Sequence, residues 1–133
     1  MRIFFDFEFD EKATGIQPIS LGMVKETGET LYLEFAEYEY STASEWIKQN
    51  VLPKLTGNVH SDWMIKEIVQ SFCEGVTEFW AYYATTDFYL LYRLFGPLMN
   101  FPGKWPHYVM DLKNLERISG CRFDKNLAHN DLP

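Results

Sequence analysis

Residues 3–9, with the sequence Ile-Phe-Phe-Asp-Phe-Glu-Phe, constrain the fold of this chain more than any other stretch. Side chains of a β-strand alternate between its two faces, so the odd-numbered residues, all apolar, share one face. Phe4, Asp6 and Glu8 share the other face. Because aromatic residues occur on both faces, the stretch predicts a central strand that is covered on both sides.

The acids Asp6 and Glu8 are costly in such a strand. Burial of an unpaired carboxylate costs several kcal/mol or forces the group to bind a proton. A divalent cation would neutralise the pair, and Asp and Glu oxygens suit Mg²⁺ or Mn²⁺. The alternative is that one or both acids lie at a frayed strand end, in contact with water or an arginine. The strand by itself leaves both interpretations open.

Length and composition bound the class of protein. The chain has 133 residues, enough for one core and too few for two ordinary domains, so we expect a single domain over residues 1–133. Its 47% apolar content is typical of a folded globular protein. No apolar run reaches the length of a membrane-spanning helix, and the chain opens directly on a strand, without a targeting leader. We therefore expect a cytoplasmic protein with no membrane partner.

Charge and cysteine content narrow the expectation further. Cys73 and Cys121 lack the spacing of a redox or zinc motif, which favours a reduced, cytosolic compartment, although a disulfide between them stays open. The formal net charge of −7 argues against a broad nucleic-acid-binding surface. It leaves room for a narrow site in which metal ions carry the positive charge.

The order of the expected elements predicts an α/β fold with a mixed sheet flanked by helices. Residues 10–18 should form a loop, and the apolar runs 19–25 and 30–35 flank a Gly-containing turn, which predicts a three-stranded antiparallel meander. Further strands are expected at 78–83 and 107–110. Helices are expected at 43–51 with a capping box at 42–45, from Ser61 or Asp62 to Gly75, at 87–95 ending at Gly96, at 111–119 ending at Gly120, and from Leu127 onward.

The other candidate functional residues do not indicate a function when each is considered alone. Asp87 follows a strand and opens a helix, where α/β folds often place sites, but Asp is common in a first helical turn and a structural role is favoured on this evidence. His129 lies in a polar tail, and Asp111 is explained as a helix N-cap. The chain contains no phosphate-binding glycine loop and no zinc pattern.

Taken in order, these pieces resemble the DEDDh 3′–5′ exonucleases, the superfamily of proofreading exonucleases and RNase T, which has a ribonuclease-H-like fold. The short sequence motifs are most similar to those of the polyadenylate-specific 3′-exoribonucleases of the AS type. The segments that carry the resemblance span nearly the whole chain: Phe4-Phe5-Asp6-Phe7-Glu8-Phe9, Ile19-Ser20-Leu21-Gly22-Met23-Val24, Val51-Leu52-Pro53-Lys54-Leu55, Tyr82-Tyr83-Ala84-Thr85-Thr86-Asp87, Leu94-Phe95-Gly96-Pro97, Asp111-Leu112-Lys113 and His129-Asn130.

The resemblance implies a metal-dependent active site. In it, Asp6, Glu8 and Asp87 hold two divalent ions, Mg²⁺ or Mn²⁺. His129 is the general base that takes a proton from the attacking water, which suits an imidazole at neutral pH. The implied reaction is hydrolysis of single-stranded RNA from its 3′ end to nucleoside 5′-monophosphates, with a preference for adenylate.

Aromatic residues near these acids are candidates for substrate binding. Phe7, Phe9 and Phe88 could stack on a terminal base, with ordinary core packing as the equal alternative. Nothing in the sequence distinguishes RNA from DNA, so a DNA 3′–5′ exonuclease is a second possibility. The aromatic surplus and the family favour a homodimer.

The chain departs from the family at its end. The family has a fourth carboxylate, an Asp five residues after the His, and then a helix that covers the sheet, whereas here Pro133 comes four residues after His129. Asp131 does not replace that acid, because two residues along a helix turn a side chain by about 200°. We expect a shortened chain that binds metal weakly and cleaves slowly. The alternative is a repurposed, inactive module that binds nucleic-acid 3′ ends.

Overall fold

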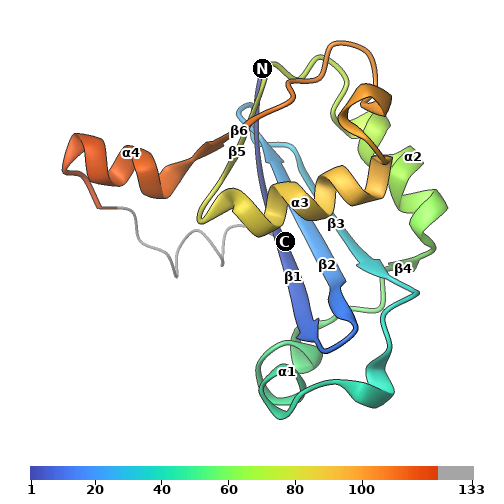
Figure 1. Ribbon diagram of the computed structural model, residues 1–133. Helices are drawn as coiled ribbons and strands as arrows, with labels where there is room; N and C mark the ends of the chain where they lie inside the picture. Colours follow the sequence, from blue (N-terminus) through green and yellow to red (C-terminus); the bar gives the residue numbers. More distant parts are fainter. Residues whose placement is uncertain (123–133) are drawn as a thin grey trace.

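The strand that begins the chain, β1, is central in a six-stranded mixed sheet (Figure 1). This computed structural model describes residues 1–122. The strand order is β4-β3-β2-β1-β5-β6, with β1, β2 and β3 antiparallel and the pairs β3–β4, β1–β5 and β5–β6 parallel. The strands are β1 (Arg2–Lys12), β2 (Gly15–Lys25), β3 (Thr30–Phe35), β4 (Val59–His60), β5 (Glu78–Ala81) and β6 (Val109–Asp111). The predicted α/β class and the three-stranded meander are confirmed, and the arrangement is consistent with a ribonuclease-H-like fold.

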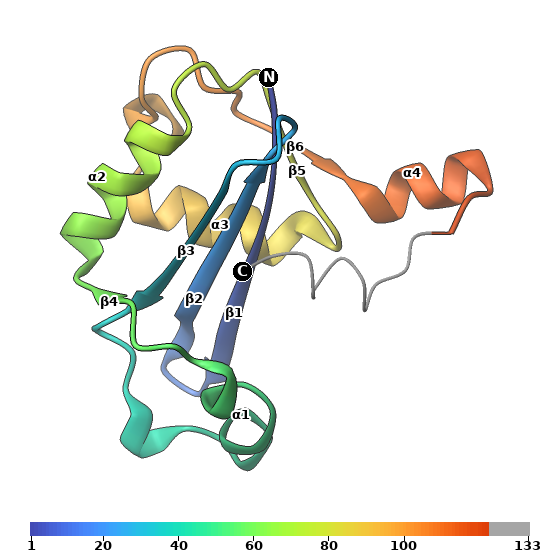
Figure 2. The same ribbon diagram turned by 180° about the vertical axis from the view of Figure 1, so that it is seen from behind.

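Helices flank this sheet. Helices α2 and α3 lie over one of its faces, and α4 projects away from the body of the molecule in both views (Figures 1 and 2). The helices are α1 (Glu45–Asn50), α2 (Asp62–Phe72), α3 (Ala84–Phe95) and α4 (Leu112–Ser119), with 3₁₀ turns η1 (Tyr40–Thr42), η2 (Leu52–Lys54) and η3 (Leu98–Asn100). No helix within residues 1–122 has the length and apolar character needed to cross a bilayer.

The main core lies between the sheet and helices α2 and α3. Ile3, Phe5 and Phe7 of β1 are buried there, as the alternation of the strand predicts, while Phe9 is half-buried at the margin. A second, smaller cluster forms where α1 and the neighbouring turns meet β2. Its buried members are Ile19, Tyr38, Ala43, Ile47 and Val51.

The first two strands are longer than predicted. The expected loop at 10–18 is a two-residue turn, Ala13 and Thr14, because β1 extends to Lys12 and β2 begins at Gly15. The pairing register shifts after Glu8, which pairs with Ser20, so that Phe9 pairs with Pro18. This bulge places one extra residue on β2 and accommodates a proline, which cannot donate to a regular ladder.

The predicted ends of α3 and α4 are confirmed, whereas α2 ends at Phe72, before the predicted end at Gly75. Ser61 caps α2, and Gly96 and Gly120 end α3 and α4. The predicted capping box at 42–45 is wrong, because Ser44 rather than Thr42 caps α1. Helix α3 begins at Ala84, earlier than the predicted start at Asp87. The helix expected from Leu127 lies outside the described residues.

Candidate active site

Strand β1 is much longer than its parallel neighbour β5. The pairing between them runs over three positions and stops at Phe4 and Trp80, although β1 continues to Lys12. If the register continued, Tyr83 would lie opposite Phe7. Instead, Tyr83 adopts a left-handed conformation with φ of 53° and ψ of 59°, and α3 begins at the next residue. Within residues 1–122 it is the only non-glycine residue with a positive φ. Such a backbone costs about 1–3 kcal/mol and is often found at functional sites.

Asp87, in the first turn of α3, contacts β1 where β5 has ended. Its Oδ1 accepts a hydrogen bond from the Phe7 N–H at 2.8 Å. The residue is only 4% exposed. A hydrogen bond from an amide to a carboxylate is stronger than one between neutral groups, so it fixes the direction of this side chain.

Asp6 and Glu8 flank the same position on β1. They are half-buried and lie on the face opposite the core residues Phe5 and Phe7. Across the antiparallel ladder Asp6 pairs with Gly22, which has no side chain to cover it, and Glu8 pairs with Ser20. The structure therefore brings Asp87 to the segment of β1 that bears Asp6 and Glu8, although Asp87 is 80 residues from Phe7 in the sequence.

The donor set suits a hard cation. Three carboxylates offer only oxygen ligands, which Mg²⁺ and Mn²⁺ prefer. Within residues 1–122, however, no three His, Cys, Asp or Glu side chains are arranged so that they could hold a metal ion by themselves. His129 lies outside the described residues. The two-ion centre and the role of His129 stay predictions.

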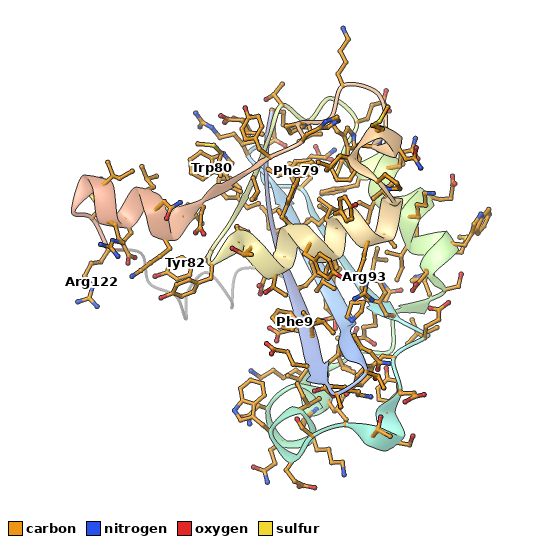
Figure 3. The ribbon with its side chains drawn as sticks, viewed as in Figure 1. Phe9, Phe79, Trp80, Tyr82, Arg93 and Arg122 are labelled. Atoms are coloured by element: carbon orange, nitrogen blue, oxygen red, sulfur yellow. The ribbon has the colours of Figure 1, made fainter. Side chains whose placement is uncertain are left out.

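The three phenylalanines proposed to stack on a base lie in different environments. The ring of Phe7 is 3% exposed and packs edge-on against Phe5, so it belongs to the core. Phe88 is half-buried and packs edge-on against Phe101. Phe9 is a half-buried residue of β1 and lies below α3 in the view of Figure 3. Of the three, Phe9 and Phe88 are the rings that retain exposed surface.

Asp111, at the end of β6, accepts hydrogen bonds from two helices. Its Oδ1 accepts from the backbone N–H of Lys113 at 2.8 Å, which caps α4 as predicted. The same carboxylate accepts from the N–H groups of Tyr83 at 3.1 Å and Ala84 at 3.0 Å. The capping acceptor for α3 thus comes from Asp111 rather than from the Tyr83 side chain. This second role was not predicted, because no local pattern signals it.

A polar network beside this junction ties α4 to the end of β5. The Tyr82 hydroxyl, which lies between α4 and the start of α3 in Figure 3, donates to the buried Glu116 carboxylate at 3.2 Å. Lys113 Nζ donates to Glu116 Oε1 at 2.8 Å. Burial and the Glu116 charge raise the pKa of Tyr82, and the hydrogen bond to Glu116 raises the pKa of Lys113. At neutral pH the phenol therefore keeps its proton and the ammonium keeps its charge.

Comparison with known proteins decides the family. No protein-family model matches the chain. Two curated proteins named 3′–5′ exoribonuclease, from two strains of Mycobacterium tuberculosis, are each 30% identical to it over 129 residues. The alignment covers 91% of this chain and 77% of each relative. The chain belongs to this family of 3′–5′ exoribonucleases. In this family member, then, the three acids on and beside β1 are the natural candidates for the active site.

Proposed function

We propose that this chain is a divalent-metal-dependent 3′–5′ exoribonuclease that hydrolyses single-stranded RNA. The observation that carries the proposal is the hydrogen bond from Phe7 N–H to Asp87, which brings a third acid to the segment of β1 that bears Asp6 and Glu8. The similarity to two proteins named 3′–5′ exoribonuclease supports the same reaction.

In the proposed site, Asp6, Glu8 and Asp87 would hold two Mg²⁺ or Mn²⁺ ions. When bound, such ions supply Lewis-acid stabilisation of the charge that develops on a phosphodiester during hydrolysis. His129 would accept the proton of the attacking water. The oxygen of that water bonds to phosphorus, the bond from phosphorus to the 3′ oxygen breaks, and the products are a nucleoside 5′-monophosphate and a shortened RNA with a 3′ hydroxyl.

The substrate preference follows from the resemblance to the AS-type enzymes, which favours adenylate at the 3′ end. Phe9 and Phe88 are half-buried rings that could stack on a terminal base. The Phe7 ring is buried and would have to leave the core to stack on a base. We propose instead that Phe7 contributes through its backbone N–H, which orients Asp87.

The test is release of mononucleotides from 3′-labelled RNA homopolymers and matched DNA oligonucleotides, with and without Mg²⁺. We expect release that requires Mg²⁺, is faster on RNA than on DNA and is fastest on oligoadenylate. Faster cleavage of DNA would overturn the assignment to RNA. Binding of 3′ ends with no nucleotide released, even at high Mn²⁺, would instead identify an inactive binding module.

The Asp6→Asn variant tests the site itself. It should lower kcat by roughly a hundredfold or more while preserving the circular dichroism spectrum, because one ligand oxygen becomes an amide nitrogen. Glu11→Gln is the matched control, since Glu11 is an exposed acid on the same strand. A wild-type rate for Asp6→Asn would eliminate the proposed role of this acid.

The His129→Ala variant tests the base. It should lower kcat about a hundredfold and leave the Mn²⁺ dissociation constant nearly unchanged, because a general base contributes to proton transfer and not to metal binding. The acid limb of the pH–rate profile should disappear with it. His107→Ala, at an exposed residue outside the site, is the control. If both variants keep the wild-type rate and pH profile, another group is the base.

A further inference from the structure

We infer that Asp111 is a positioning residue for Asp87, because its carboxylate holds the left-handed turn at Tyr83 from which α3 starts. The inference rests on the proposed role of Asp87 in the active site. Asp111 would then have two roles, capping α4 and holding the start of α3. The junction of β5, β6 and α3 would in this way determine the orientation of Asp87.

The phase of α3 decides where Asp87 points. Successive residues of an α-helix are rotated by about 100°, so a start shifted by one residue would turn Asp87 away from the Phe7 amide. The start is defined by Tyr83, the last residue before the helix, with its positive φ. A tyrosine does not adopt this conformation readily, so the surrounding structure has to hold it there.

Asp111 is placed to hold this turn. Strand β6 pairs with β5 in parallel, and Ala81 lies opposite Asp111 at the last position of the ladder. The carboxylate therefore lies beside the point where the chain leaves β5. Its two oxygens accept from consecutive N–H groups, those of Tyr83 and Ala84, at 3.1 and 3.0 Å.

The connection to the acid is short. Asp87 is in the first turn of α3, and Asp111 accepts a hydrogen bond from the N–H of Ala84, the first residue of that helix. The Asp87 carboxylate in turn accepts from the Phe7 N–H at 2.8 Å. Tyr82, next to the turn, is fastened separately through its hydroxyl to Glu116 of α4. Loss of Asp111 also removes the N-cap of α4, but the Tyr82–Glu116 hydrogen bond still ties α4 to this junction. The Tyr83 and Ala84 N–H groups, in contrast, lose their side-chain acceptor.

The Phe7 amide reports on this geometry without RNA or metal. Its hydrogen-exchange rate, measured by ¹⁵N-resolved NMR on the full chain, should rise about tenfold in Asp87→Ala, which removes the acceptor. In Asp111→Ala it should rise at least about fivefold, and Asp111→Asn, which keeps one acceptor oxygen, should lie between. Ser61→Ala is the matched control, because it removes a side-chain cap from α2 without touching α3. Exchange of Phe7 in both Asp111 variants within about twofold of the Ser61→Ala rate would overturn the inference.

A double variant tests the route through Tyr83. Glycine adopts a left-handed conformation without the Cβ penalty, so Tyr83→Gly added to Asp111→Ala should restore at least about half of the lost protection on a logarithmic scale. If it restores none, Asp111 does not act through the turn.

Kinetics separate this inference from the proposed function. Asp111→Ala should lower kcat about tenfold with a smaller change in KM, because the reacting groups are misplaced while the rest of the RNA surface is intact. If Asp87→Ala abolishes turnover while Asp111→Ala leaves both turnover and Phe7 exchange unchanged, the inference fails and the nuclease assignment stands. If the chain releases no nucleotide but Phe7 exchange responds as expected, the nuclease assignment fails and the positioning contact stands.

Discussion

Glu34 shows how a single residue can be misjudged from its sequence context. It lies on β3 between the buried Leu33 and Phe35, where strand alternation turns an acid toward the other face of the sheet. It is nevertheless only 1% exposed, because the chain at 56–57 closes over it. Its carboxylate accepts from the N–H groups of Thr56 at 2.6 Å and Gly57 at 3.0 Å. Glu34 thus fastens a loop rather than serving a reaction.

Removal of Glu34 should therefore destabilise the fold. We expect Glu34→Ala to lower the free energy of unfolding by roughly 2–4 kcal/mol, because the Thr56 and Gly57 N–H groups lose a charged acceptor and the buried Glu34 side chain leaves a cavity. Urea denaturation would measure the loss. Glu67→Ala, at an exposed acid on α2, should change stability by less than about 0.5 kcal/mol. Equal effects of the two substitutions would contradict the structural role of Glu34.

The candidate acids differ in how far they could be predicted. Asp6 and Glu8 are conspicuous because carboxylates are unusual in an aromatic strand, and Asp87 becomes conspicuous through its place in the ordered motifs. The roles of Glu34 and Asp111 depend on chain segments 22 and 28 residues away in sequence. No local pattern carries that information.

At the scale of elements, Gly96 and Gly120 predicted the ends of α3 and α4 correctly, whereas Gly75 did not predict the end of α2, which comes at Phe72. The end of α3 at Gly96 was predicted, but its start was not, because a left-handed tyrosine has no sequence signature. The extent of β2 was missed for a related reason. Pro18 indicates a strand break, yet the bulge opposite Phe9 lets the strand continue through it.

Gly96 provides a test at this scale. Its φ of 88° and ψ of −159° lie in a region that is essentially reserved for glycine, so Gly96→Ala should cost about 1–3 kcal/mol. An added Cβ would lie 3.5 Å from Asn100 Nδ2, an ordinary contact, so the cost comes from the backbone. The check is the midpoint of urea denaturation.

The control for that variant is Met99→Ala, since Met99 is 92% exposed in the next turn of chain. It should change stability by less than about 0.5 kcal/mol. A Gly96→Ala protein as stable as the control would show that the end of α3 tolerates another conformation.

At the scale of the whole molecule, charge limits how nucleic acid can bind. The chain carries a net charge of −7, and several of its cations already have acidic partners, among them Arg2 with Glu78 and Lys25 with Glu29. We therefore expect RNA to contact the protein through few phosphates, close to its 3′ end. A broad basic track along the surface is not compatible with this balance.

Salt dependence measures that footprint. With about two phosphate contacts, raising the salt concentration from 50 to 200 mM should weaken RNA binding by less than about tenfold. Fluorescence anisotropy of labelled oligoadenylate with the Asp6→Asn variant, which we expect not to degrade it, would give the dissociation constants. A fall of about a thousandfold would instead indicate a wide electrostatic surface.

The conformation of Tyr83 also sets the size of the sheet. If this residue were extended, the parallel pairing between β5 and β1 would continue toward Phe7. The Phe7 N–H would then donate to a backbone carbonyl of the lengthened β5. The same N–H cannot serve a ladder and a carboxylate equally well, so a longer sheet and an oriented Asp87 exclude one another. A β-branched residue at position 83 favours extended structure and should therefore lengthen the sheet. Asp87 would then lose the hydrogen bond from the Phe7 N–H that orients it.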